Sequence, residues 1–350
     1  MDKLLVVDGD FKAELRRHFP RAEDFGRAFP LHALIEDRRA VMKTHLAYLR
    51  AGAQIIRTNT YYATKDAFEK HLKLTSPFDY TEYLHGAVNL AKHAVKIYGE
   101  ETGEDMNSEE YKSRRPLIAG CCSSVMASLY DDEIKKFYIC DEEVIDDNLM
   151  YSPDYLLFFH SWRVYDLLQA GVDILSFEAI PTFREAIAIL NVLRYYKTRA
   201  RAWISLLCPE DAKIVSRVDF PVVAAHCFKT LPKQIIAVGA ECDSPGTMIP
   251  AIRSLNGCLK DKPCMLYTSK YVAPGKGNIG ASSSSATLQH GYVHEWWDAG
   301  VRYIGGGPDT VAEDIQQIRE QVDYFYQSTD KSFLSRNPCS YRNKKNLSKL

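Results

Sequence analysis

Eight short apolar segments recur along the 350 residues, and they constrain the fold more than any other feature. Each is apolar without strict alternation, which is typical of strands buried on both faces of a parallel sheet. The predicted strands are Leu4–Asp10, Gln54–Thr60, Pro116–Cys122, Asp173–Ile180, Arg201–Cys208, Gln234–Cys242, Cys264–Lys270 and Val301–Gly307. Eight strands that alternate with helices predict an α/β protein with a closed (β/α)8 TIM barrel, whose active site lies where the strands end.

Segments with helical periodicity lie between these strands. Arg38–Ala51 is followed by Gly52 and Tyr155–Ala170 by Gly171, and glycine is the residue most favoured just past a helix. An open doubly wound sheet is the competing fold. It would favour a GxGxxG turn after the first strand, which Asp8-Gly9-Asp10-Phe11 does not supply. We therefore assign residues 1–330 to one barrel domain.

Other segments are predicted to be connections. Residues 61–84 and 99–115 are long, polar and aromatic-rich, and His226–Cys227 follows the fifth strand. We expect all three to be connections between the barrel elements, with His226 and Cys227 at the surface or in packing contacts.

Residues 331–350 differ from the rest in charge. They carry several lysines and arginines and no acidic residue, and they end in Ser348-Lys349-Leu350. This tripeptide is the peroxisomal targeting signal, which an import receptor reads at a flexible terminus. We predict a flexible basic tail, a peroxisomal location with the cytoplasm as the alternative, and the import receptor as a partner.

The charge of the chain limits its other partners. Its 44 basic and 45 acidic residues leave a formal net charge of -1, so no overall field attracts nucleic acid or an acidic membrane. No apolar stretch approaches the length of a membrane span. We expect neither nucleic acid nor a membrane as a partner.

Polar residues follow or end several predicted strands and should converge on one mouth of the barrel. Five of them are candidates for ligand binding, and the carboxylates among them could hold the ammonium group of a ligand. These candidates are Asp8, Thr58, Asn59, Glu178 and Glu241.

Thiols also end three of the strands. Cys121, Cys122, Cys208 and Cys242 are candidate metal ligands, since zinc takes thiolates in tetrahedral sets. Cysteine is also among the most buried residue types, and no CxxC pair is present. Packing therefore remains the alternative for all four.

At these strand ends the sequence resembles the homocysteine S-methyltransferase family, which includes betaine- and S-methylmethionine-dependent enzymes. The resemblance extends over roughly residues 4 to 325. The matching segments are Asp8–Gly9 with Glu14–Leu15, Ala51–Ile56 with Thr58–Tyr61, Ala170–Asp173 with Phe177–Pro181, Ala237–Gly239 with Cys242, and Ala299–Gly306. The family's chemistry implies a zinc ion on three thiolates, which binds the homocysteine sulfur and keeps it nucleophilic.

The zinc positions are where the chain departs from the family pattern. Cys242 matches the family's ligand on the sixth strand, but Gly307 and Pro308 stand where the family has its pair of cysteines. Neither side chain can ligate a metal, and a catalytic zinc needs three protein ligands. The resemblance thus implies a degenerate zinc site and, with it, a pseudoenzyme for which we expect no cofactor.

Three functions remain open for such a barrel. The first is a non-catalytic protein that binds a small amino-acid-like ligand or a protein partner. The second is an active methyltransferase that moves a methyl group to homocysteine, with zinc on a site rebuilt from Cys121, Cys122, Cys208 and Cys242. The third is a barrel that binds a phosphorylated small molecule at Gly305–Pro308, although Asp309 would oppose an anion there.

Overall fold

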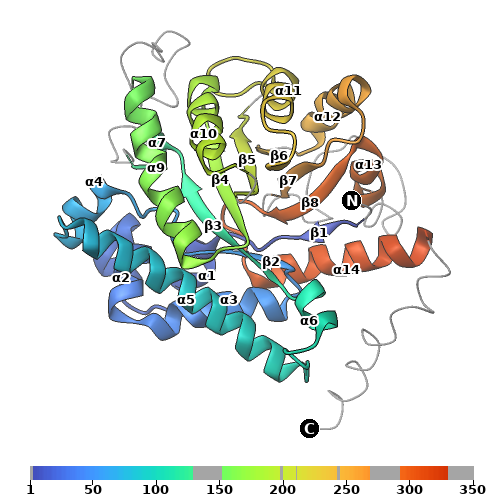
Figure 1. Ribbon diagram of the computed structural model, residues 1–350. Coiled ribbons are helices and arrows are strands. Elements are labelled where there is room, and N and C mark those ends of the chain that lie inside the picture. The colour runs from blue at the N-terminus through green and yellow to red at the C-terminus, as the bar shows by residue number, and fades with distance from the viewer. Residues whose placement is uncertain are drawn as a thin grey trace.

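The computed structural model is a single barrel of parallel strands surrounded by helices (Figure 1). It describes residues 3–128, 152–197, 200–209, 211–242, 245–268 and 292–329. The strands are β1 (Leu5–Val6), β2 (Ile55–Arg57), β3 (Leu117–Ser123), β4 (Ile174–Ile180), β5 (Ala202–Leu207), β6 (Ile235–Glu241), β7 (Cys264–Thr268) and β8 (Val301–Gly306).

The sheet closes on itself. Its strand order is β1-β8-β7-β6-β5-β4-β3-β2, and every pair of neighbours is parallel. Backbone hydrogen bonds from Gln54 to Val6 (2.8 Å) and from Asp8 to Ile55 (3.0 Å) connect β1 with β2. The predicted (β/α)8 TIM barrel is confirmed.

Helices connect consecutive strands and cover the outside of the sheet. They are α1 (Phe11–Arg16), η1 (Ala22–Ala28), α2 (Phe29–Glu36), α3 (Arg38–Arg50), α4 (Lys65–Ala67), η2 (Phe68–Leu72), α5 (Pro77–Glu101), α6 (Glu109–Arg114), α7 (Val125–Ser128), α9 (Pro153–Ala170), α10 (Phe183–Tyr196), α11 (Phe220–Thr230), α12 (Pro245–Leu259), α13 (Tyr292–Ala299) and α14 (Ala312–Thr329).

Local signals explain where the two helices predicted most clearly begin and end. The Asp37 side chain caps α3 by accepting the N–H groups of Arg39 and Ala40, and Gly52 follows with a φ of 98°. Ser152 caps α9, which ends at Gly171 with a φ of 78°. Both predicted glycine stops are confirmed.

Alternation along the strands divides the core into two layers. One cluster fills the barrel itself, and it includes Val7, Ile55, Trp203, Met265 and Tyr267. A larger cluster lies between the strands and the surrounding helices. The side on which a strand residue points therefore decides whether it can reach the mouth of the barrel.

The predicted connections need correction. Residues 61–84 and 99–115 contain α4, η2, α6 and both ends of α5, and His226 and Cys227 lie within α11. Their polar and aromatic composition hid short helices, of which α4 buries no residue, η2 buries Phe68 and α6 buries Tyr111. The predicted tail, residues 331–350, lies outside the described residues.

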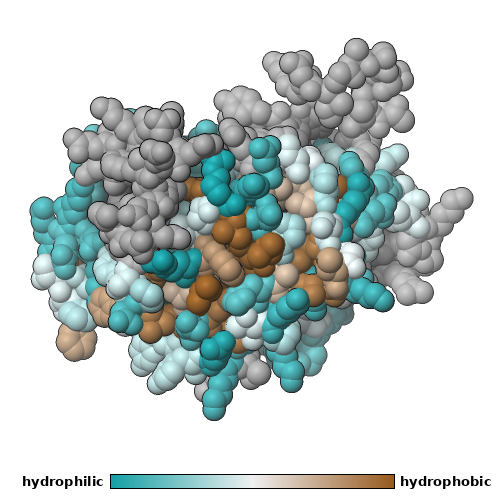
Figure 2. All heavy atoms as spheres, turned by 90° about the horizontal axis from the view of Figure 1, so that it is seen from above, coloured by the Kyte–Doolittle hydropathy of each residue, from teal (hydrophilic) through white to brown (hydrophobic). Residues whose placement is uncertain are grey.

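The outer helices differ in length and in how much apolar surface they expose. No helix among the described residues is long and apolar enough to cross a membrane. Seen from above, apolar atoms gather near the middle of the surface (Figure 2), and exposed apolar side chains on the outer helices include Leu157, Ile187 and Val222.

Candidate functional site

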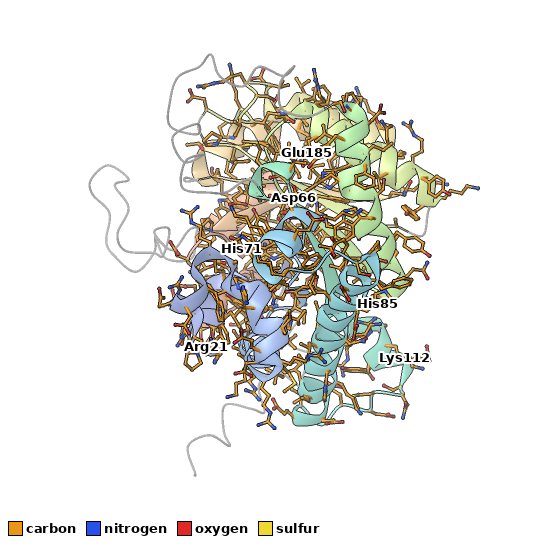
Figure 3. All side chains as sticks on the ribbon, turned by 90° about the vertical axis from the view of Figure 1, so that its left-hand side faces the viewer. Arg21, Asp66, His71, His85, Lys112 and Glu185 are labelled. Atoms are coloured by element: carbon orange, nitrogen blue, oxygen red, sulfur yellow. The ribbon has the colours of Figure 1, made fainter. Side chains whose placement is uncertain are left out.

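A cavity of about 460 Å³ opens where the strands end. Its wall includes four of the five ligand-binding candidates, Thr58, Asn59, Glu178 and Glu241, while Asp8 lies fully buried behind Arg57. Figure 3 views the molecule from the left of Figure 1, and the labelled Asp66 and His71 place the segment of α4 and η2 near the centre of that face.

Arg57, at the end of β2, lines this cavity and makes several hydrogen bonds beneath it. Its Nε donates a hydrogen bond to Asp8 Oδ1 (2.7 Å), and its backbone N–H donates to Asp8 Oδ2 (2.7 Å). Its Nη2 donates to the carbonyl oxygens of Gly9 (2.7 Å) and Asp8 (3.2 Å). Both oxygens of the Asp8 carboxylate are thus engaged by one residue of the same chain.

Glu178 on β4 is also engaged from within. The indole N–H of Trp203 donates to its Oε1 (2.9 Å), and the Tyr267 hydroxyl lies 2.9 Å from both carboxylate oxygens. Arg57 approaches from the side, with Nη1 3.8 Å from Oε1 and its guanidinium 4.9 Å from the centroid of the Tyr267 ring. The predicted pair of carboxylates therefore surrounds a cation that the chain itself provides.

Burial and the pairing with each other shift the pKa values of Asp8 and Arg57. Burial raises the pKa of Asp8 to about 6, against the opposing effect of the Arg57 charge. Burial would lower the pKa of Arg57, but Tyr267, Asp8 and Glu178 outweigh it and hold that pKa well above its ordinary value. Arg57 is therefore charged, and Asp8 is close to changing its protonation state near neutral pH.

Thr58 and Asn59 are positioned differently from each other. The Thr58 hydroxyl contacts that of Thr60 (2.7 Å) and accepts the Cys121 N–H (3.0 Å), so it ties β2 to β3. The Asn59 amide donates to the carbonyl of Pro30 (2.8 Å), its side-chain oxygen accepts no hydrogen bond from a described residue, and Asn59 lines the cavity. Of the two, Asn59 has more capacity to meet a ligand.

A second cavity, of about 350 Å³, adjoins the first. Glu241, Lys12, Tyr61 and Tyr62 line both, and His71 lines the second alone. Glu241 is half-buried at the end of β6, on the shared wall. The two cavities together offer room for a ligand longer than the first cavity would hold.

The start of α14 offers little to an anion. The N–H of Val311 donates to Asp314 (2.8 Å), that of Ala312 to Glu14 (3.0 Å), and that of Asp309 to Asp10 (3.0 Å). Carboxylates of the chain thus occupy the donors that a phosphate after β8 would use.

Comparison with known proteins places this geometry in a family. The family model for homocysteine S-methyltransferase matches residues 5–322. The chain belongs to the homocysteine S-methyltransferase family. It is 28% identical to a betaine-homocysteine S-methyltransferase of Drosophila melanogaster (91% of this chain, 94% of the relative) and 31% identical to homocysteine S-methyltransferase 3 of Arabidopsis thaliana (89% and 88%).

A solved structure agrees with this membership. The metallated form of the homocysteine methyltransferase MmuM from Escherichia coli superimposes with a TM-score of 0.72, at 26% identity, over 91% of this chain and 96% of that one. The family barrel is therefore retained over nearly the whole described chain.

The zinc ion that the family resemblance implies does not fit the side chains present at the mouth. Gly307 and Pro308 line the cavity just after β8 without offering a ligand atom. Within the described ranges, no group of three His, Cys, Asp or Glu side chains could hold a metal ion. Gly307 and Pro308 therefore contribute no thiolate to a zinc site at the end of β8.

The substitute thiols are divided by the alternation of the strands. Cys121 lines the cavity, whereas Cys122, one residue later, packs in the outer layer with Cys208, and Cys242 packs against that layer. Burial raises the pKa of Cys121 well above its usual range and that of Cys122 to about 11, which favours thiols over thiolates. Of the four thiols the structure thus brings only Cys121 to the cavity wall, while Cys208 lies near Cys242 and Glu241.

The sequence reasoning missed Arg57, Trp203 and Tyr267. One signal was available for Arg57, because a charged residue directly follows the apolar pair Ile55–Ile56 in a predicted strand. Nothing in the sequence indicated that Trp203 and Tyr267 donate to Glu178, because that depends on which inward residues of three strands share one level of the barrel.

Proposed function

We propose that this chain is a small-ligand-binding member of the homocysteine S-methyltransferase family that does not carry out zinc-dependent methyl transfer. One observation carries the proposal: Gly307 and Pro308 line the cavity where the family pattern has its paired cysteines. Without those thiolates, nothing at the end of β8 would hold zinc and keep a homocysteine sulfur ionised.

The placement of the remaining thiols supports the same view. A rebuilt site would need side chains from both sides of the sheet to meet, since only Cys121 of the four candidates lines the cavity. The cavity itself is retained, with polar groups from several strands and about 460 Å³ of space. Binding without the family's chemistry is the function that these features favour.

The test measures zinc and methyl transfer in the same preparation. We expect protein purified under reducing conditions to contain close to no zinc, and to transfer no methyl group from S-methylmethionine or betaine to homocysteine. One zinc per chain that disappears in Cys242→Ala would overturn the proposal in favour of a rebuilt methyltransferase. Cys258→Ala, at an exposed cysteine away from the cavity, is the matched control.

The peroxisomal location stays a separate prediction, because Ser348–Leu350 lies outside the described residues. A fluorescent protein fused before residue 1 should move to peroxisomes, and deletion of the last three residues should leave it in the cytosol. A cytosolic signal from the intact fusion would contradict the prediction.

A further inference from the structure

We infer that Arg57 determines the ligand class of the cavity, by filling the position in which an amine would meet the buried carboxylates. The ligand is then a small carboxylic acid without an amino group, whose carboxylate meets Arg57 and Lys12. This inference rests on the proposed function, since it names what the retained cavity binds.

The first part of the argument concerns the positions open to an ammonium group. Asp8 is fully buried, and both of its carboxylate oxygens already accept hydrogen bonds from Arg57. An incoming ammonium would have to displace a guanidinium that makes three side-chain hydrogen bonds to Asp8 and Gly9. Those bonds are charge-assisted and buried, so the exchange is unfavourable.

Glu178 offers no better position. Its Oε1 accepts from Trp203 and lies 2.9 Å from the Tyr267 hydroxyl, which also reaches Oε2. An ammonium group has three donors and needs acceptors for them when it leaves water. The cavity floor thus presents acceptors that are already used, and an amine placed there would lose hydration without full replacement.

The second part concerns donors that remain available. Among the described residues, Arg57 Nη1 has no hydrogen-bond acceptor, and it lies 3.8 Å from Glu178 Oε1. Arg57 is 15% exposed, and it lines the cavity. Nη1 can therefore donate to a carboxylate that enters from the mouth.

Lys12 supplies a second positive charge. It lines both cavities, and its Nζ lies 5.9 Å from the centroid of the Tyr62 ring without an ion pair to any described residue. The Asp10 carboxylate acts on the Lys12 charge, but its two oxygens already accept the backbone N–H groups of Lys12 and Asp309. A ligand carboxylate would have Arg57 and Lys12 as its partners.

The experiment compares ligands that lack either the amine or the carboxylate. L-homocysteine and 4-mercaptobutanoate share the thiol and the carboxylate, and 3-mercaptopropylamine keeps the amine but lacks the carboxylate. By titration calorimetry under reducing conditions, we expect 4-mercaptobutanoate to bind about tenfold or more tightly than L-homocysteine, and the amine not to bind. A tenfold preference is the order of effect of one unsatisfied charged group.

Variants assign the preference to Arg57. Arg57→Met uncovers Asp8 and Glu178 and should reverse the order of the two acids, whereas Arg57→Lys should keep it. Arg115→Met is the matched control, because it removes an arginine paired with Asp173 (2.6 Å) away from the cavity, and it should leave the preference unchanged. If Arg57→Met does not fold, the affinities of the wild-type chain for 4-mercaptobutanoate and L-homocysteine still test the inference.

Three outcomes overturn the inference: tighter or equal binding of L-homocysteine by the wild-type chain, the same preference in folded Arg57→Met, or no binding of any compound to any variant. The first two outcomes leave the proposed function intact, because the cavity then still binds a small ligand. Zinc-dependent methyl transfer together with a preference for the amine-free acid would contradict the proposed function and leave the role of Arg57 intact.

Discussion

Two arginines of this barrel, one partly and one fully buried, are held in opposite ways. Arg57, inside the barrel, lies against the carboxylates of Asp8 and Glu178 and faces a cavity. Arg163, on α9 outside the barrel, is fully buried, and its Nη2 donates to the Ser123 carbonyl (2.9 Å). Accordingly the pKa of Arg57 is raised, whereas burial lowers that of Arg163.

The surroundings of Arg163 explain its role. Its Nη2 lies 3.3 Å from His160 Nδ1, and His160 Nε2 lies 2.9 Å from Glu185, which also accepts the Val125 N–H (2.8 Å). Burial lowers the pKa of His160, so a neutral ring that accepts at Nδ1 and donates at Nε2 fits both contacts. This chain of contacts holds the end of β3 against α9 and α10; Glu185 is labelled in Figure 3.

The comparison separates two uses of a buried charge. Arg57 lines a cavity, and its pairing with the two carboxylates leaves the N–H groups of Nη1 able to donate to a ligand. Arg163 uses its contacts on backbone and on a histidine, and it contributes to the position of a strand end. Burial alone therefore does not indicate that an arginine binds a ligand. A cavity that the same arginine lines is the feature that indicates it.

Arg163→Met should produce the largest loss of stability. It leaves the Ser123 carbonyl without its donor and Glu185 without a compensating charge, so we expect the free energy of unfolding to fall by about 3–5 kcal/mol. Urea denaturation at constant slope measures it. Arg50→Met, which removes an exposed partner of Glu101, should lose no more than about 1 kcal/mol. Equal losses would erase the distinction between buried and exposed arginines.

The titration of Asp8 should give the next largest effect. Because its pKa in the folded protein is about 6, above the ordinary 3.8, Asp8 stabilises the fold most when protonated. Relative to Asp8→Asn, the wild-type chain should lose about 2–3 kcal/mol of stability as the pH rises from 4 through 6. Arg57, Glu178 and Tyr48 are the groups that face it.

The measurement is the difference in unfolding free energy between the two proteins at pH 4, 5, 6 and 7. A difference that stays constant over this range would mean that Asp8 has an ordinary pKa and that Arg57 shields it fully. A difference that grows in the opposite direction would mean that the pair behaves as a conventional salt bridge.

Tyr267→Phe should have the smallest of these effects. It removes one hydroxyl that donates to Glu178, and the cavity allows water to take its place, so we expect a loss of about 1–2 kcal/mol in unfolding free energy. Tyr165→Phe, at a half-exposed hydroxyl on α9, should change nothing measurable. A loss as large as that of Arg163→Met would show that the barrel interior is as intolerant as its outer layer.

Much of the fold could be predicted because its signals are local. Apolar runs marked the strands, and Gly52 and Gly171 marked helix ends, since periodicity and left-handed backbone conformation depend on neighbouring residues. The helices within 61–84 and 99–115 were missed because their polar surfaces face solvent. The buried face of α5 is decided by α3, α9 and β3, against which it packs.

The candidate site was predicted less completely. Asp8 and Glu178 were identified, but as acceptors for a ligand, whereas the structure pairs them with Arg57. The four thiols were placed in one mouth, although the outward direction of Cys122 removes it. Both errors concern the direction of side chains, which a one-residue change of register reverses.

The sequence by itself determined the family, the alternation of strands and helices, and the absence of cysteines at Gly307 and Pro308, because each is a property of residue identity and order. Only the tertiary structure decided that Arg57 occupies the carboxylates and that Cys121 and Cys122 face opposite layers. Closure of the barrel brings together residues 49 positions apart, such as Asp8 and Arg57, and no local pattern encodes that distance.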